Sequence, residues 1–471
     1  MSEPRLRSAV SWRWRERLRQ WLLSPRLALL RRSVPRPLRQ WVGKRLEKPL
    51  PSGLRFARTP EWVSSSTSAS LESATLGSFP SGDTAVPGLN VYGYFSRWLG
   101  LGECARLYGR AMLSSGWSVS LNDIDIAIPH DRQDRSLAAY LGQRPSYLCD
   151  LIFVNPDHWH DVLHSIRESG GTAKYVIGYW FWELEAFPRS WLAALEHVDE
   201  IMVSSAFVER AIRRVCDKPV TRVPLPLQLA GDSGLQRRHF GLPEEDYVFL
   251  CTFDFASGAA RKNPHAVIRA FRHAFPHGDE AATLLIKTSN GGRYAPLLWN
   301  LLNAAAGDRR IVVRDDMLER KDLQALHRCV DVYVSLHRSE GFGLGMAEAM
   351  CMGKPVIATA YSGNLEFMRQ ANSCLVDYRM VPVVEGEYPH AEGQCWADPD
   401  HVDAAHYMQA LYRDRSLGPR LGGQAARDMS RNFSTDACME VLRRKVQEVS
   451  RRQVDVLPIV EAGWQIRQNS V

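Results

Sequence analysis

A glycine-rich turn between two carboxylates is the part of the sequence with the clearest chemistry. Within residues 331–366, an apolar run ends near Leu336 and a helical pattern starts a few residues later. Glu340 precedes the turn, and Glu348 follows in the helical segment. The glycines between them are Gly341, Gly343 and Gly345. Glycines let the backbone approach a ligand, and a helix N-terminus offers free N–H groups that suit a diphosphate. Carboxylates accept hydrogen bonds from sugar hydroxyls. The alternative, a tight connection without a ligand, leaves both carboxylates unexplained.

A basic pair, Arg261 and Lys262, follows a second apolar run at residues 247–255. We expect Asn263 to N-cap a helix with Pro264 as its first residue, so the pair would stand at a helix N-terminus. Cations in that position can neutralise a leaving diphosphate, as a metal does in other enzymes. The alternative is an exposed basic pair. The apolar face expected for this helix consists of Ala266, Val267, Ala270, Phe271, Ala274 and Phe275.

Three weaker signals lie in the first half of the chain. Gly100 and Gly102 follow the run 89–95, where they indicate either a ligand-binding loop or simply a helix start. His158 follows the run 148–155, and an exposed loop histidine is the ordinary alternative. Residues 178–183 combine four aromatic side chains with Glu183, a composition that suits sugar stacking and equally a buried core.

The turn closely resembles the donor-site signature of the GT-B glycosyltransferases of glycosyltransferase family 4, also called glycosyl transferases group 1. That signature is a Glu, a Gly-Phe-Gly-Leu turn, and a second Glu after seven intervening residues. The positions that match it are Glu340, Gly341, Phe342, Gly343, Leu344 and Glu348. The resemblance implies that Glu340 contacts the transferred sugar and Glu348 binds the nucleotide ribose. It also implies retention of anomeric configuration, with neither a metal nor a covalent cofactor.

The same resemblance extends to the other candidates. Gly100 and Gly102 resemble the family's N-terminal glycine-rich loop near the donor phosphate, and His158 resembles a polar group near the reacting centre. The chain departs from the family pattern at Ser257, where an Arg usually stands five residues before the Lys. Arg261 is our expected substitute for it. The predicted catalytic residues are therefore Glu340, Lys262, Arg261 and His158.

The elements that must position these residues form two series of short apolar runs separated by helical patterns. Such alternation predicts parallel sheets with crossover helices, here two facing doubly wound, Rossmann-like domains with a cleft between them. This is an α/β fold of GT-B architecture. We expect an acceptor-side domain at 89–230 and a donor domain at 240–430. The remaining predicted segments are a basic arm at 1–50, a Ser/Pro/Gly-rich linker at 51–88 and a C-terminal helix and tail at 431–471.

Charge is concentrated in the arm. The chain has 471 residues and a net charge of +7, but residues 1–50 carry fourteen Lys/Arg against three Glu, a surplus of eleven. The remainder is therefore about −4 (7 minus 11), which argues against a nucleic-acid partner. Apolar residues at helical spacing between the arginines favour an anionic membrane surface as a partner of the arm, and a solvated tail is the alternative. Nine dispersed cysteines and the lack of a ~20-residue apolar run predict a cytoplasmic protein, peripheral to the inner face of the membrane at most.

Together these features predict a metal-independent, retaining glycosyltransferase. It would move a hexose-type sugar from a nucleotide-sugar donor to a glycan or a lipid-linked acceptor, as in polysaccharide biosynthesis. One alternative is a nucleotide-sugar epimerase of the same fold. The other is a catalytically silent sugar-binding or scaffold protein.

Overall fold

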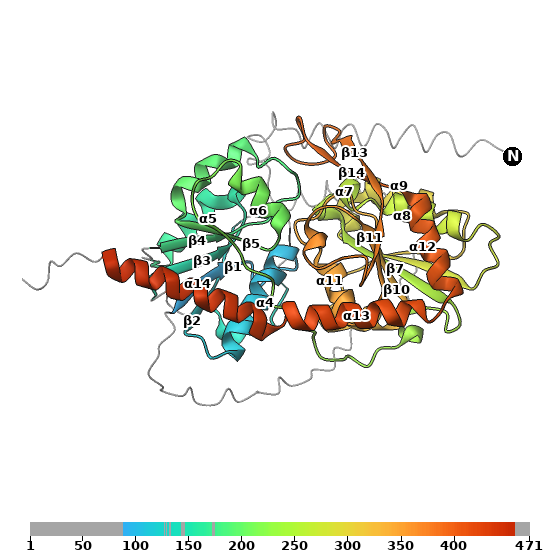
Figure 1. Cartoon of the computed structure of the whole chain (residues 1–471), viewed down its shortest axis with the longest axis horizontal. Helices are drawn as coiled ribbons and strands as arrows, with labels where there is room; N and C mark the ends of the chain where they lie inside the picture. The colour runs from blue at the N-terminus through green and yellow to red at the C-terminus, as the bar shows by residue number, and fades with distance from the viewer. Residues whose placement is uncertain are drawn as a thin grey trace, which may run out of the picture.

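The computed structural model describes residues 88–456, apart from 127, 129, 131–132, 143–146 and 172–174. The predicted arm, nearly all of the predicted linker and the last residues of the tail lie outside these residues. The described chain forms two lobes side by side, blue to green for the first and yellow to orange for the second (Figure 1).

The first lobe is built on six parallel strands in the order β2-β1-β3-β4-β5-β6. These are β1 (Leu89–Gly93), β2 (Val119–Asp123), β3 (Cys149–Phe153), β4 (Tyr175–Tyr179), β5 (Glu200–Val203) and β6 (Val220–Arg222). Its main helices are α4 (Gly100–Ser114), α5 (Trp159–Glu168) and α6 (Ala206–Arg213). Each strand coincides with one of the apolar runs in the sequence, because strands of a sheet covered on both faces are apolar throughout.

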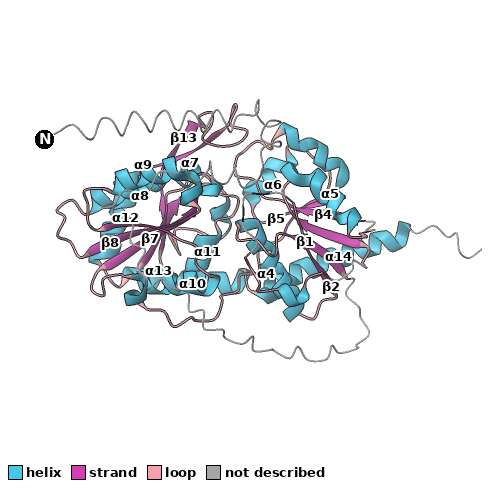
Figure 2. Ribbon diagram, turned by 180° about the vertical axis from the view of Figure 1, so that it is seen from behind, coloured by secondary structure: helices cyan, strands magenta, loops and turns pink. Residues whose placement is uncertain are grey.

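The second lobe repeats this plan with the strand order β12-β11-β10-β7-β8-β9. The strands are β7 (Tyr247–Asp254), β8 (Ala282–Ser289), β9 (Ile311–Asp315), β10 (Val332–Ser335), β11 (Val356–Thr359) and β12 (Cys374–Val376). The helices are α7 (Ala259–Lys262), α8 (Pro264–Ala274), α9 (Ala295–Ala305), α10 (Arg320–Cys329), α11 (Leu344–Cys351), α12 (His401–Arg413) and α13 (Leu417–Asn432). Helices cover both faces of each sheet (Figure 2), so the predicted doubly wound architecture is confirmed.

An antiparallel hairpin that the sequence analysis did not predict follows β12. Its strands are β13 (Tyr378–Pro382) and β14 (Cys395–Pro399). The hairpin lies at the edge of the second lobe beside the boundary with the first (Figure 1). There the side-chain amide of Gln394 forms two hydrogen bonds with the backbone of Ala186 in the first lobe.

The described part of the chain begins and ends on the first lobe. After α13, helix α14 (Thr435–Val456) runs along the first lobe (Figure 1). Lys445 of α14 forms an ion pair of 2.9 Å with Glu200, whose side chain is fully buried at the start of β5. The chain passes from the first lobe to the second near Leu227 and returns near Phe433. These two segments lie side by side, since the Leu227 N–H donates to the Phe433 carbonyl at 2.9 Å.

All nine cysteines lie in the described part of the chain and are unpaired. Within that part, no helix is both long enough and apolar enough to cross a bilayer.

Candidate active site

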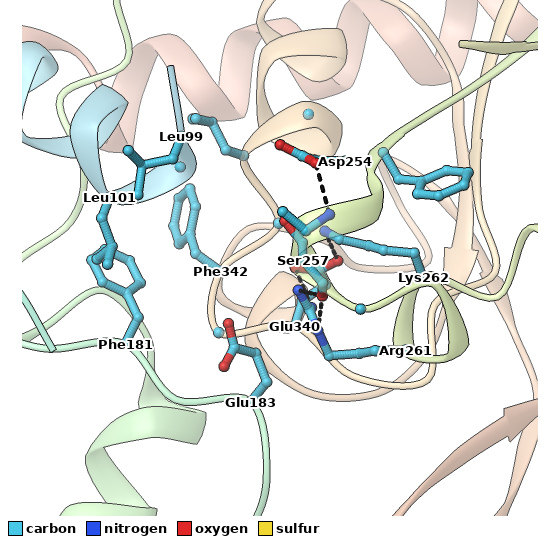
Figure 3. Close-up of a pocket in the computed structure, with 18 of the residues that line it drawn as sticks. Leu99, Leu101, Phe181, Glu183, Asp254, Ser257, Arg261, Lys262, Glu340 and Phe342 are labelled. Atoms are coloured by element: carbon cyan, nitrogen blue, oxygen red, sulfur yellow. Dashed lines mark hydrogen bonds and ion pairs between the residues drawn. The ribbon is translucent and has the colours of Figure 1, made fainter. Parts of the chain in front are cut away.

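A cavity of about 630 Å³ lies between the lobes. It opens at the carboxyl ends of strands from both sheets, where open parallel sheets bind their ligands. Ten of the predicted site residues line it, and these are Gly100, His158, Arg261, Lys262, Glu340, Gly341, Phe342, Gly343, Leu344 and Glu348. In Figure 3, Leu99, Leu101, Phe181 and Phe342 form an apolar side, facing the charged side chains of the second lobe.

The donor turn is held by backbone contacts that only small residues permit. Gly343 has φ of 97°, a left-handed conformation, and starts helix α11. Gly363 packs so closely on the turn that a Cβ there would lie 2.2 Å from the Gly341 carbonyl oxygen. The Gly363 N–H donates to the Glu340 carbonyl, and the Ser362 hydroxyl accepts from the Glu340 N–H, both at 2.8 Å. Residues 362–363 thus fix the path of the turn below the cleft.

Glu340 is the centre of a buried charge cluster. Arg261 contacts its Oε2 at 3.0 Å and Lys262 contacts its Oε1. Burial opposes charge on this carboxylate, but the two cations hold the pKa of Glu340 below its usual range. Burial also lowers the pKa of Lys262, and Glu340 partly offsets that effect. Lys262 and Glu340 are therefore already paired, so any ligand anion must share the lysine with the carboxylate.

The local structure around the basic pair differs from the prediction. Helix α8 starts at Pro264 with the predicted apolar face buried, but Asn263 makes no side-chain cap. Its backbone is left-handed, with φ of 51°, and its side chain makes no hydrogen bond to the helix, so the predicted capping contact is wrong. Arg261 and Lys262 end the preceding one-turn helix α7 rather than opening α8. Arg261 is buried against the backbone carbonyls of Ser257 and Ser339.

Glu348 is bound by a residue that the sequence analysis missed. Arg320, at the start of α10, contacts Glu348 at 2.7 Å and Glu103 of the first lobe at 2.5 Å. Burial raises the pKa of Glu348 despite the arginine. Arg320 therefore connects the predicted ribose-binding carboxylate with the other lobe.

The glycines of the first lobe have different surroundings. Gly100 is the first residue of α4 and lines the cleft, and a Cβ there would meet no atom within 4 Å. Gly102 does not line the cleft. It faces the protein interior instead, where a Cβ would lie 2.5 Å from the Tyr94 carbonyl oxygen. The tight packing of α4 on that carbonyl explains the need for glycine at position 102.

Polar groups follow β3 and β4 on the first-lobe side of the cleft. His158 is about one third exposed, at 37%, and its Nε2 lies 3.7 Å from the Asp157 carboxylate. Glu183, after β4, lines the cleft on the side of Arg261 and Glu340 (Figure 3). The Tyr388 hydroxyl, from the unpredicted hairpin, donates to Glu183 at 2.8 Å.

Two further cleft residues were missed because they lie inside regular elements. Lys287 is in β8, and burial lowers its pKa to about 8 against the opposing charge of Asp315. His327 is in α10, and neither of its buried ring nitrogens has a hydrogen-bond partner among the described residues. Burial lowers the pKa of His327 to about 3. The residue type could have flagged Lys287, which interrupts an apolar strand, but His327 lies in a helix rich in polar residues and gives no such signal.

Within the described residues, no group of three or more His, Cys, Asp and Glu side chains is arranged to hold a metal ion.

The two facing lobes and the cleft between them define the GT-B architecture. Residues 247–382 match the model of the family described as glycosyl transferases group 1. The resemblance of the turn to that family is therefore confirmed over the part of the second lobe that the model matches.

Individual proteins agree with this assignment. The D-inositol 3-phosphate glycosyltransferase of Xylanimonas cellulosilytica is 27% identical over 232 residues, which are 49% of either chain. The match thus spans about half the length of that relative. Sucrose-phosphate synthase from Thermosynechococcus elongatus is similar in structure, with a TM-score of 0.54 at 16% identity over 78% of this chain and 99% of that one. The Anabaena protein HepE, in complex with UDP and glucose, has a TM-score of 0.54 at 11% identity over 79% and 100%. At these identities, the structures establish the fold.

Proposed function

We propose that this chain is a glycosyltransferase that moves a hexose-type sugar from a nucleotide-sugar donor to a glycan or a lipid-linked acceptor. The observation that carries the proposal is the Gly341–Gly343 turn, which opens helix α11 into the cleft between the buried carboxylates Glu340 and Glu348. Helix N-termini favour diphosphates, and carboxylates bind sugar and ribose hydroxyls. The UDP and glucose bound by HepE, which shares the fold, support a nucleotide sugar as the donor.

In this proposal the diphosphate binds at the N-terminus of α11, where it shares Lys262 with Glu340. Negative charge develops on the diphosphate as the bond to the sugar breaks, so a preorganised cation stabilises the transition state. Glu340 then accepts a hydrogen bond from the transferred sugar. Arg261 holds Glu340 in place, and His158 lies on the acceptor side of the reacting centre.

We further propose that transfer retains the anomeric configuration and needs neither a metal nor another cofactor. The resemblance of the donor turn supports retention. The cations at 261 and 262 support metal independence, because they supply positive charge where a metal would act. Activity should therefore persist in EDTA.

A thermal-shift panel of nucleoside diphosphates and their sugars tests the proposal. A ligand at one hundred times its dissociation constant stabilises the folded state by roughly 2.7 kcal/mol. We expect one nucleotide family to stabilise the protein and its sugar to be hydrolysed slowly without acceptor. Isomerisation of the sugar nucleotide would instead identify an epimerase, and binding without any turnover would identify a silent sugar-binding protein.

A membrane-associated location for the acceptor is a separate proposal. It rests on the surplus of eleven positive charges in residues 1–50, which lie outside the described structure. We propose that this arm holds a cytoplasmic enzyme at an anionic membrane surface.

A further inference from the structure

The hairpin that the sequence did not predict supplies one wall of the cleft. Glu387, Tyr388 and Pro389, between β13 and β14, all line the cavity. The Tyr388 ring lies 5.6 Å from the Arg261 guanidinium, so it adjoins the charge cluster around Glu340. The hairpin therefore reaches the part of the cleft where the transferred sugar would lie.

The same hairpin is anchored on the first lobe next to Glu183. The side-chain NH2 of Gln394 donates to the Ala186 carbonyl at 2.8 Å, and its side-chain oxygen accepts from the Ala186 N–H at 3.2 Å. The Trp182 ring packs against the rings of Tyr388 and His390, with centroids 6.1 and 5.9 Å apart. The Ser339 hydroxyl, next to Glu340, also donates to the Glu183 carbonyl. Glu183 and Tyr388 are thus held in a fixed position relative to the donor turn.

The Glu183 carboxylate has a donor on one side and an open cavity on the other. The Tyr388 hydroxyl donates to its Oε2, and the side chain is half-buried at the cleft. Burial and the neighbouring Glu183 raise the pKa of Tyr388 well above its ordinary value, so the phenol remains a hydrogen-bond donor. A carboxylate has capacity for several hydrogen bonds, so Glu183 can accept further ones from hydroxyls in the cavity.

The charges on this side of the cleft select against anions. Asp157 and Glu183 face it from the first lobe, together with the partly exposed imidazole of His158. The hairpin adds Glu387, which is paired with Arg338 at 3.4 Å. The cations Arg261 and Lys262 are already paired with Glu340, and Lys262 is the one assigned to the donor diphosphate. A phosphate in this position would meet carboxylates, whereas a hydroxyl would find hydrogen-bond acceptors.

We propose that Glu183 and Tyr388 form the acceptor subsite, and that the acceptor unit bound there is an uncharged carbohydrate. This inference rests on the proposed glycosyltransferase function. It separates the chain from its relative named for inositol phosphate, since the subsite favours hydroxyls over phosphate. Glu183 orients the acceptor hydroxyl towards the donor sugar at Glu340, and the hairpin fixes Glu183 through Tyr388.

Binding to the full chain, saturated with the nucleoside diphosphate selected by the thermal-shift panel, tests the subsite. The probes are methyl glycosides of glucose, galactose and mannose, and the 6-phosphates of the same sugars, titrated calorimetrically. We expect at least one uncharged glycoside to bind and its phosphate to bind roughly tenfold more weakly. Tighter binding of the phosphates, or no binding of any glycoside, overturns the proposal.

Two variants with matched controls tie the binding to these residues. Glu183→Gln should weaken glycoside binding roughly tenfold or more, and Tyr388→Phe by a smaller factor, with nucleotide affinity unchanged. Glu392→Gln and Tyr378→Phe make the same chemical changes on the same hairpin, away from the cavity, and should have no effect. Unchanged glycoside binding in Glu183→Gln contradicts the subsite. A parent protein that binds no nucleotide contradicts the glycosyltransferase proposal instead, so the two failures are distinguishable.

Discussion

Glu340 has two roles in the structure, and a substitution must separate them. As well as facing the cleft, it neutralises the buried Arg261 and the neighbouring Lys262. Removing one partner of a buried ion pair costs roughly 3–5 kcal/mol, because the remaining charge is left without compensation. An alanine at this position would therefore confuse loss of catalysis with loss of stability.

We expect Glu340→Gln to reduce sugar transfer by roughly one hundredfold or more while nucleoside diphosphate binding persists. The amide keeps the shape of the side chain and one acceptor oxygen, but it no longer balances the cations. Initial rates of donor hydrolysis, together with the thermal shift by the nucleotide, measure the two effects separately. Parent-like turnover in the variant would remove Glu340 from the catalytic assignment.

Lys287 is the opposite case, a buried cation that forms no ion pair with a carboxylate among the described residues. Its folded pKa of about 8 lies below the ordinary value, so burial of the charged form costs stability at pH 7. Below pH 8 the lysine is charged in both states and the whole cost is present. Between about pH 8 and 10.4 the folded state has lost the proton that the unfolded chain keeps, so this group makes stability rise with pH.

Lys287→Met should therefore stabilise the ligand-free protein at pH 7 by about 3 kcal/mol, with the gain falling towards zero near pH 10 to 11. Urea denaturation at several pH values measures this difference. Lys321→Met, which removes a partly exposed lysine, should change stability little at any pH. If the gain in the free energy of unfolding does not depend on pH, burial of the charged lysine is not its cause.

At the scale of elements, the donor turn depends on how the turn after β11 supports it. A Cβ at Gly363 would collide with backbone atoms of residues 340 and 341, which no side-chain movement can relieve. We expect Gly363→Ala to displace the turn and weaken nucleotide binding by roughly tenfold or more, with some loss of stability. Calorimetric titration of the nucleotide measures the affinity.

Gly292→Ala is the matched control, since a Cβ at that position would meet no atom within 4 Å. Its nucleotide affinity and stability should equal those of the parent. If Gly363→Ala also binds nucleotide normally, the tight contact below the turn has no functional role.

The sequence predicted the strands of the two sheets, because most of them are short apolar runs buried between helices. It did not predict the hairpin, since β13 and its connection contain exposed, proline- and glutamate-bearing segments without a clean alternation. It also missed Arg320 and Tyr388. Their importance comes from contacts with Glu103, Glu348 and Glu183, and contacts between distant segments leave no local pattern.

At the scale of the whole molecule, helix α14 stabilises a lobe from the far end of the chain. Lys445 neutralises Glu200, which also accepts hydrogen bonds from Thr221 and Tyr175. Lys445→Met leaves a fully buried carboxylate without its cation, and we expect a loss of about 3 kcal/mol. The same Lys-to-Met change thus has opposite signs at positions 445 and 287. Urea denaturation checks this, and a neutral effect at position 445 would show that α14 is only loosely attached.

The basic arm gives the last prediction. Residues 1–50 should bind anionic vesicles through roughly 1 kcal/mol per basic residue near the surface, and added salt should weaken the binding. A chain starting near residue 85, with a net charge of −3 by the same count, should stay in solution and keep its activity. Co-sedimentation of both proteins with anionic vesicles measures this. Equal pelleting of the two, or of neither, would make the arm a solvated tail.

The return of the chain to the first lobe also affects how this protein can be rebuilt. Because α14 belongs to the first lobe, the second lobe is an insertion within it, and a cut at one place cannot separate the two. The entry and exit segments are hydrogen-bonded to each other at Leu227 and Phe433. Domain insertions are tolerated where the ends of the inserted unit lie close together. The second lobe is therefore an inserted domain whose two ends lie next to each other. Replacing it by recombination, to exchange the sugar specificity, would need two junctions, one near Leu227 and one near Phe433.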